Sequence, residues 1–170
     1  MELVVRPAEA DDATGLLQLL MQLQNESSTF MVANDLSAVD GVTEADNIEY
    51  LQTTTNNIIL VMADEQANLY GVISAAAIPG QPRVAEIGVA VLEKYQGHGF
   101  AQILLEELLL WAHDFSSIEK LVLTVQAQNL PAIHIYEKYG FTKITASTTQ
   151  ILNIRREKVT AFDMERVVEK

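Results

Sequence analysis

The stretch of sequence that decides the fold is EIGVAVLEKYQGHGFAQILLEELLLW, residues 86–111. It begins inside an apolar strand expected over residues 84–91, passes through a turn with two glycines, and continues into an amphipathic helix expected over about residues 97–115. Glycines at a helix start allow consecutive backbone N–H groups to converge on a phosphate at the positive end of the helix. An ordinary tight turn from strand to helix fits the same residues, so this stretch alone leaves both interpretations open.

Length and composition favour one globular domain over residues 1–170. Hydrophobic residues make up 49% of the chain and charged residues 20%, and no apolar run approaches the ~18 residues of a membrane span. The first residues lack the basic start and apolar centre of a signal peptide. We therefore expect a cytoplasmic protein that does not act on membranes.

Charge and cysteine content narrow the classes of function. Eleven Lys and Arg against 23 Asp and Glu give a formal net charge of −12, which disfavours nucleic acid as a partner and suits a cationic substrate. Acidity that only keeps a protein soluble explains the same charge. With no cysteine, the chain has no disulfide, no thiolate metal site and no cysteine nucleophile, and its histidines show no metal-ligand spacing.

The remaining pattern alternates strands with helices, as is typical of an α/β domain. Strands are expected at residues 3–6, 58–63, 69–77, 84–91 and 120–125, from residue 141 and in the tail, and helices at about 11–24, 43–53, 97–115 and 129–139. Asp11 or Asp12 offers an N-cap to the first helix, and Thr43 with Asp46 resembles a capping box for the second. Residues 25–42 are expected to form an irregular loop that carries function.

The crossover from strand to helix to strand predicts that strands 84–91 and 120–125 are parallel neighbours. A second pattern follows them: QAQNLPAIHIYEKYGF, residues 126–141, which contains a short helix with Pro131 in its first turn and Gly140 at its end.

With both patterns in place, the chain resembles the GCN5-related N-acetyltransferase (GNAT) family. Its Q/R-x-x-G-x-G/A signature is matched by Gln96, Gly99 and Ala101, and its N-x-x-A-x-x-x-Y-x-x-x-G-F pattern by Asn129, Ala132, Tyr136, Gly140 and Phe141. Chance would rarely place two such motifs in this order, near thirty residues apart. The resemblance covers nearly the whole chain, while the long loop and the tail match the family only in the type of element and not in a sequence motif.

The resemblance implies a mixed central sheet flanked by helices, whose parallel strands four and five splay apart around acetyl-CoA. Main-chain groups of Val89, Ala90 and Val91 would pair with the pantetheine arm. The pyrophosphate would be held by the loop residues Gln96, Gly97, His98, Gly99, Phe100 and Ala101. Asn129, Ala132 and Tyr136 complete the implied cofactor set, and the family chemistry needs no metal.

Tyr136 also has a chemical argument for a role as general acid. A departing thiolate has a pKa resembling the ~8.5 of cysteine, and a tyrosine near ~10 is close enough to deliver a proton to it. A tyrosine that only packs in the core is the alternative. Glu86 is the candidate general base, although binding the substrate's cation or lying exposed at a strand edge are equally open for it. Some family members carry a glutamate on the following strand, where this chain has Thr124.

These features predict an enzyme that transfers an acetyl group from acetyl-CoA to a primary amine by direct attack in a ternary complex. The acceptor is expected to be a small-molecule or peptide amine, and the acidic charge favours a small cationic one. The alternative is a non-catalytic acyl-CoA-binding sensor or regulatory module. The tail supplies strands that can pair across a subunit boundary, which leaves a homodimer open.

Overall fold

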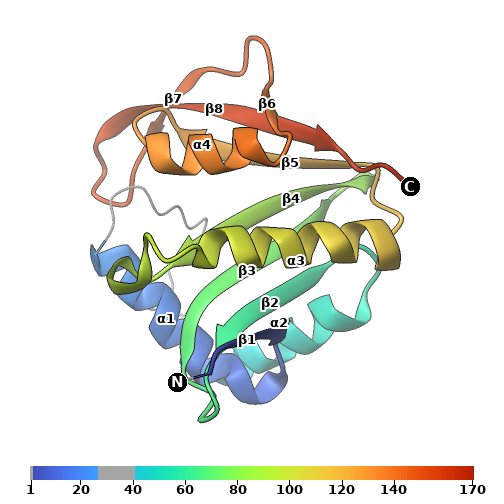
Figure 1. Ribbon diagram of the computed structural model, residues 1–170, viewed down its shortest axis with the longest axis vertical. Coiled ribbons are helices and arrows are strands. Elements are labelled where there is room, and N and C mark those ends of the chain that lie inside the picture. The colour runs from blue at the N-terminus through green and yellow to red at the C-terminus, as the bar shows by residue number, and fades with distance from the viewer. Residues whose placement is uncertain (1, 27–40) are drawn as a thin grey trace.

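In the computed structural model, which describes residues 2–26 and 41–170, a mixed sheet carries helices on both faces (Figure 1). The strands are β1 (Val4–Pro7), β2 (Ile58–Ala63), β3 (Leu69–Ile78), β4 (Gln81–Val91), β5 (Lys120–Gln126), β6 (Thr142–Lys143), β7 (Thr149–Leu152) and β8 (Lys158–Val167). The α-helices are α1 (Ala13–Glu26), α2 (Gly41–Thr53), α3 (Phe100–Phe115) and α4 (Leu130–Lys138), and two short 3₁₀ turns are η1 (Ala10–Asp12) and η3 (Glu93–Tyr95).

The sheet has the order β1-β2-β3-β4-β5-β8-β6, with β7 paired to β8. Its one parallel pair in the described chain is β4 with β5, and that pairing runs only from Val84↔Lys120 to Glu86↔Val122. Both strands continue past these residues, β4 to Val91 and β5 to Gln126. The expected splay between the fourth and fifth strands is therefore confirmed, and the α/β fold with it.

The two faces of the sheet bury separate hydrophobic clusters. On one face, α3 and α4 pack over the central strands, and α3 contributes the buried stripe Leu104, Leu105, Leu108 and Ala112. Leu121, Leu123 and Val125 of β5 belong to this same cluster. On the other face, α1 and α2 cover side chains such as Val61 and Val72. The amphipathic character expected of the helix after the turn is thus confirmed, although Phe115 at its end is exposed.

Several helix boundaries differ from those expected. α3 begins at Phe100 rather than near residue 97, because Gly97 and Gly99 have φ values of 82° and 79° that an α-helix does not adopt. α2 already begins at Gly41, so Thr43 lies inside the helix and does not cap it. Asp12 belongs to η1, where its carboxylate accepts the Glu9 N–H at 2.8 Å.

The strand boundaries also differ in two places. β4 begins at Gln81, three residues earlier than expected, because the residue after the Gly80 turn already pairs with Ile78. The strand expected from residue 141 is only two residues long, and the chain then turns before β7. Residues 27–40 of the expected functional loop lie outside the described residues, whereas residues 25–26 and 41–42 belong to α1 and α2. Within residues 2–26 and 41–170, no helix has both the length and the hydropathy of a membrane span.

Candidate active site

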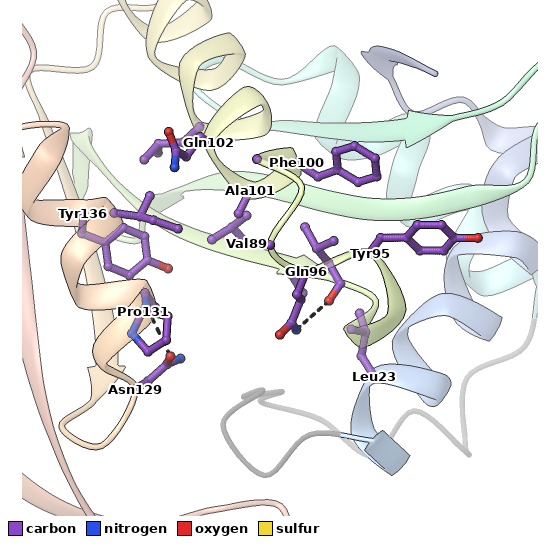
Figure 2. A pocket seen from close by; sticks show the side chains of 17 residues that line it. Leu23, Val89, Tyr95, Gln96, Phe100, Ala101, Gln102, Asn129, Pro131 and Tyr136 are labelled. Atoms are coloured by element: carbon purple, nitrogen blue, oxygen red, sulfur yellow. Dashed lines mark hydrogen bonds between the residues drawn. The ribbon is translucent and has the colours of Figure 1, made fainter. Parts of the chain in front are cut away.

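A cavity opens where β4 and β5 separate, bounded by the start of α3 and by α4 (Figure 2). It is lined by Leu23, Val89, Ala90, Val91, Tyr95, Gln96, Gly97, Gly99, Phe100, Ala101, Gln102, Leu105, Asn129, Pro131, Ala132, Ile135 and Tyr136. No Lys or Arg of the described residues belongs to this lining. Any anion bound here therefore has to be held mainly by backbone and neutral side-chain donors.

The loop between β4 and α3 is built to present backbone amides. Gly97 and Gly99 both adopt the left-handed conformation, and nothing lies within 4 Å of where a Cβ would stand at either residue. Gln96 N–H donates to Glu93 O at 3.1 Å, and Ile103 N–H donates to Gly99 O at 3.1 Å. The amides between these two, from residue 97 to residue 102, have no acceptor among the described residues. They form an open cradle at the positive end of α3.

Two contacts hold this loop against the sheet. The Gln96 side-chain Nε2 donates to the carbonyl oxygen of Val91 at 3.1 Å, which ties the loop to the end of β4 (Figure 2). The rings of Tyr95 and Phe100 are stacked with centroids 6.1 Å apart, and Tyr95 meets Tyr70 edge-on at 4.8 Å. The cradle is therefore anchored on both sides of its glycines.

Asn129 starts α4 at the opposite side of the cavity. Its side-chain oxygen accepts the Ala132 N–H at 3.4 Å as an N-cap, and Pro131 occupies the first turn, where its missing N–H costs nothing. Because the oxygen faces the helix, the amide NH₂ of Asn129 remains as the donor on the cavity side. The short helix is thereby fixed at the end nearest the splay.

Tyr136 lies on α4 with 9% of its surface exposed, and its hydroxyl points into the cavity (Figure 2). Its ring packs against Phe141 with centroids 5.9 Å apart. The hydroxyl has no hydrogen-bond partner among the described residues. Burial raises the pKa of Tyr136 to about 12, so the group remains protonated at neutral pH and acts as a donor.

Glu86 is not part of the cavity. It is exposed on β4, in the last pair before the strands separate, and it alternates with Ala85 and Ile87, which pack under α3. Its side chain is therefore on the sheet face opposite α3 and α4. Tyr136 and Glu86 approach the splay from opposite faces.

Comparison with known proteins defines the family. Residues 18–141 match the model described as "Acetyltransferase (GNAT) family". The chain belongs to this family. As a member it is an N-acetyltransferase that depends on acetyl-CoA.

Three similar proteins illustrate the range of this GNAT family. Over 168 residues and 98% of both chains, the sequence is 26% identical to the L-amino acid N-acetyltransferase AaaT of Escherichia coli strain K12. Over 83 residues it is 32% identical to the spermidine N(1)-acetyltransferase of Vibrio cholerae, a match that spans 49% of this chain and about half of that relative, 48%. The structure of yncA, a putative acetyltransferase from Salmonella typhimurium with its cofactor acetyl-CoA, has a TM-score of 0.82 at 18% identity, covering 100% of this chain and 96% of that one.

The positions expected to bind acetyl-CoA in this GNAT protein can now be located. The following line the cavity: Val89, Ala90, Val91, Gln96, Gly97, Gly99, Phe100, Ala101, Asn129, Ala132 and Tyr136. His98 does not; it is exposed, and its ring lies 5.9 Å from that of Phe100. The unobstructed glycine positions and the unpaired amides fit a pyrophosphate, and the unpaired edge of β4 fits an amide-bearing arm.

Sequence reasoning missed some of the lining residues. Pro131 and Ile135 are on the cavity side of α4, and Ile135 precedes Tyr136 directly, so helical position relative to Ala132 would have indicated them. Tyr95 belongs to η3 immediately before the loop. Leu23 comes from α1, and no local pattern connects that helix with the GNAT motifs. Among the described residues, no group of three or more metal-ligating side chains comes together.

Proposed function

We propose that this protein acetylates a small cationic primary amine by direct attack on acetyl-CoA in a ternary complex. The observation that carries the proposal is the separation of β4 from β5 after Glu86↔Val122, with the Tyr136 hydroxyl on one side of the opening and the exposed Glu86 of β4 on the other sheet face. Acetyl-CoA supplies the acetyl thioester. The absence of cysteine from the chain agrees with a reaction that has no acyl-thiol enzyme intermediate.

The cofactor-binding role rests on the cradle at the start of α3. The amides of residues 97–102 would hold the pyrophosphate, since they are unpaired and lie at the positive end of the helix. Backbone groups of Val89 and Ala90 on the free edge of β4 would bind the pantetheine arm, and the Asn129 NH₂ would donate to it from α4. The carbonyl oxygen of Val91 is already bonded to Gln96, so Val91 acts mainly by placing the loop.

Tyr136 is proposed to donate the proton that the departing thiolate needs. Its pKa of about 12 lies well above the ~8.5 of a thiol, so complete transfer from tyrosine to thiolate is uphill in the free protein. A short hydrogen bond from the Tyr136 hydroxyl to the developing charge is still favourable. The hydroxyl can then pass its proton to the thiolate while it receives another proton from the attacking amine. Tyr136 would thus act by donating a hydrogen bond to the growing negative charge while staying protonated itself.

The amine would reach the thioester from the sheet face opposite α3 and α4, because those helices and the cradle occupy the other face. On the amine side α1 and α2 cover β2 and β3, whereas Glu86 and Gly88 of β4 are exposed. Glu86 lies on that open face at the last paired residue before the splay. We propose that it removes a proton from the arriving ammonium, through water, before attack. A pH–rate profile of Glu86→Gln tests this role: the acidic limb should shift or vanish, and retention of the wild-type limb would exclude Glu86.

The acceptor class follows from charge and from the relatives. A net charge of −12 attracts cationic amines, and the named relatives are enzymes for spermidine and for L-amino acids, both of which carry primary amines. An assay of free thiol release from acetyl-CoA across polyamines, amino acids, amino acid amides and peptides tests the proposal. We expect amine-dependent release, strongest with small cations. Cofactor binding without any amine-dependent release would favour a non-catalytic acyl-CoA sensor, and a preference for neutral peptides would overturn the acceptor class.

The single domain over residues 1–170, the cytoplasmic location, the homodimer and the lack of nucleic acid partners stay predictions. Size-exclusion chromatography with light scattering would decide the oligomeric state.

A further inference from the structure

The open face of the splay carries a second carboxylate, Asp163 of β8. Glu86 pairs with Val122, and Thr124 is two residues further along β5, so Thr124 shares the face of Glu86. Thr124 pairs in turn with Asp163, which places that aspartate on the same face. The intervening β5 residues Leu121, Leu123 and Val125 pack into the opposite cluster under α3 and α4, which confirms the alternation.

Across the gap from Thr124, β4 offers no side chain. Gly88 is the register counterpart of Thr124, two residues beyond the last pair on each strand. Among the described residues, a Cβ at Gly88 would have Ser74 Oγ as its nearest neighbour, at 3.9 Å, so none of them crowds the space in front of the residue. The opening through the sheet is thus bordered by a glycine on one strand and by a hydroxyl on the other.

Asp163 is held in place at this border. Thr124 Oγ1 donates to Asp163 Oδ1 at 2.7 Å. The backbone of Asp163 is fixed as well, because its N–H donates to Ser147 Oγ at 3.0 Å and its carbonyl oxygen accepts the Ile144 N–H at 2.8 Å. The carboxylate is half-buried and directed towards the strand that borders the gap. A side chain fixed in this way is suited to bind a ligand.

The charge of Asp163 is not balanced by a described residue. Glu165, two positions along β8 on the same face, pairs with Lys120 Nζ at 3.3 Å. Asp163 forms no such ion pair with the described residues, and its second oxygen, Oδ2, accepts no hydrogen bond from a described donor. A half-buried carboxylate without a cation gains most from binding a positively charged group that arrives from solvent.

We propose that Asp163, oriented by Thr124, binds the positively charged group of the acceptor amine at the open face of the splay and so determines its specificity for cations. Asp163 is a substrate-binding residue in this proposal, and Thr124 is a positioning residue that acts through it. The inference rests on the proposed acetyl transfer, because it assigns the acceptor side of that same site.

The decisive variant is Asp163→Asn, which removes the charge while its Oδ1 can still accept the Thr124 hydrogen bond. With spermidine as probe, we expect KM for the amine to rise about tenfold or more and kcat to change much less, since charge-assisted hydrogen bonds are the strong ones. The affinity for acetyl-CoA and the melting temperature should stay at wild-type values. Calorimetric titration of spermidine into the CoA-loaded protein should show the same weakening without turnover.

Glu165→Gln is the matched control, because it makes the same charge change on the same strand and face, beside the closed part of the β4–β5 pair. It should leave KM for spermidine near the wild-type value. Thr124→Val should raise that KM by a smaller factor, about threefold, and Thr124→Ser should restore it by returning the hydroxyl. If Asp163→Asn lost acetyl-CoA binding through misfolding, the Thr124 pair of variants would decide.

The outcomes separate this inference from the proposed function. A wild-type enzyme that acetylates spermidine, together with an unchanged KM in Asp163→Asn, overturns the role of Asp163 alone. Equal effects of Asp163→Asn and Glu165→Gln on KM for spermidine also overturn it, because they would show only that any negative charge on this face attracts the amine. No thiol release from the wild-type enzyme with any amine overturns the proposed function itself.

Discussion

The side chain of Gln96 donates a hydrogen bond to the carbonyl oxygen of Val91 at 3.1 Å, joining the glycine loop to the last residue of β4. This bond couples the two parts of the protein that are proposed to hold acetyl-CoA: the amide cradle and the free strand edge. It also explains physically why a glutamine suits this position, since a side chain with an NH₂ donor can close the loop back onto the strand.

Replacing Gln96 by Ala should weaken acetyl-CoA binding. Loss of one partly buried hydrogen bond is worth about 1 kcal/mol, so KM for acetyl-CoA should rise about fivefold, with a smaller change in kcat. Steady-state kinetics at saturating amine would measure it. Gln66→Ala is the control, because the exposed Gln66 lies in the β2–β3 turn and only its backbone N–H forms a bond there. Equal KM values in both variants would contradict the anchoring role.

Gly99→Ala should disturb the cradle through backbone strain rather than through a clash. Nothing lies within 4 Å of the Cβ position, but the φ of 79° costs an alanine about 1–2 kcal/mol. KM for acetyl-CoA should rise about tenfold if the loop relaxes to avoid this cost. Gly15→Ala makes the same substitution inside α1, where the new Cβ meets Leu69 at an ordinary 3.7 Å, and should instead stabilise the protein by about 0.5–1 kcal/mol. A destabilised Gly15→Ala or an unaffected Gly99→Ala would count against this explanation.

Tyr136→Phe should lower kcat about 100-fold and leave KM for acetyl-CoA nearly unchanged, because it removes one proton donor and little packing. Burial holds the pKa of Tyr136 near 12, so its hydroxyl should cause no decline in kcat as the pH rises to about 10. Tyr139→Phe is the matched control, since Tyr139 caps the C-terminal end of α4, lies outside the cavity lining and donates a hydrogen bond to Glu106. Wild-type turnover in Tyr136→Phe would exclude the donor role.

Asp12→Asn should destabilise the fold without touching the active site. Asp12 accepts two hydrogen bonds from Arg6, at 2.7 and 2.9 Å, and one from the Glu9 N–H, with 6% of its side chain exposed. Losing the charge in this setting should cost about 2 kcal/mol of unfolding free energy at neutral pH. The exposed Asp11, changed in the same way, should cost almost nothing.

The Arg6 hydrogen bond lowers the pKa of Asp12 below its ordinary value of 3.8, so the carboxylate binds its proton less readily in the folded state. The stability that this gives is present above pH 3.8 and is lost as the pH falls through the lower folded-state pKa. Urea denaturation of wild type and Asp12→Asn should therefore give curves that converge at acid pH. A constant difference at all pH values would contradict the ionic origin.

Much of the site was predictable because its signals are local. The two left-handed glycines before α3 and the Asn129 cap with Pro131 meet short-range requirements of the backbone. Residue types next to one another in the sequence are enough to indicate each of them. The crossover from β4 through α3 to β5 was predictable for the same reason. His98 shows the limit of that logic: it lies within the motif, yet the loop directs it away from the cavity lining.

Other features depend on strand register and are not visible along the chain. Glu86 and Tyr136 are both in the recognisable stretches, but only the sheet shows that they meet the splay from opposite faces. Leu23 reaches the cavity from α1, and Asp163 reaches Thr124 across 39 residues of sequence. A shift of one residue in β8 would turn Asp163 to the other face, so no local pattern could have assigned it.

By itself, the sequence determined the glycine turn before α3, the capped helix that carries Tyr136 and the family to which the chain belongs, because each depends on residue types at fixed short spacings. The tertiary structure alone decided where β4 and β5 part and which carboxylates face the opening. Pairing stops after Glu86↔Val122, and Thr124 with Asp163 then borders the gap. Hydrogen bonds between strands distant in sequence set that register, and burial of alternate residues under α3 and α4 fixes it.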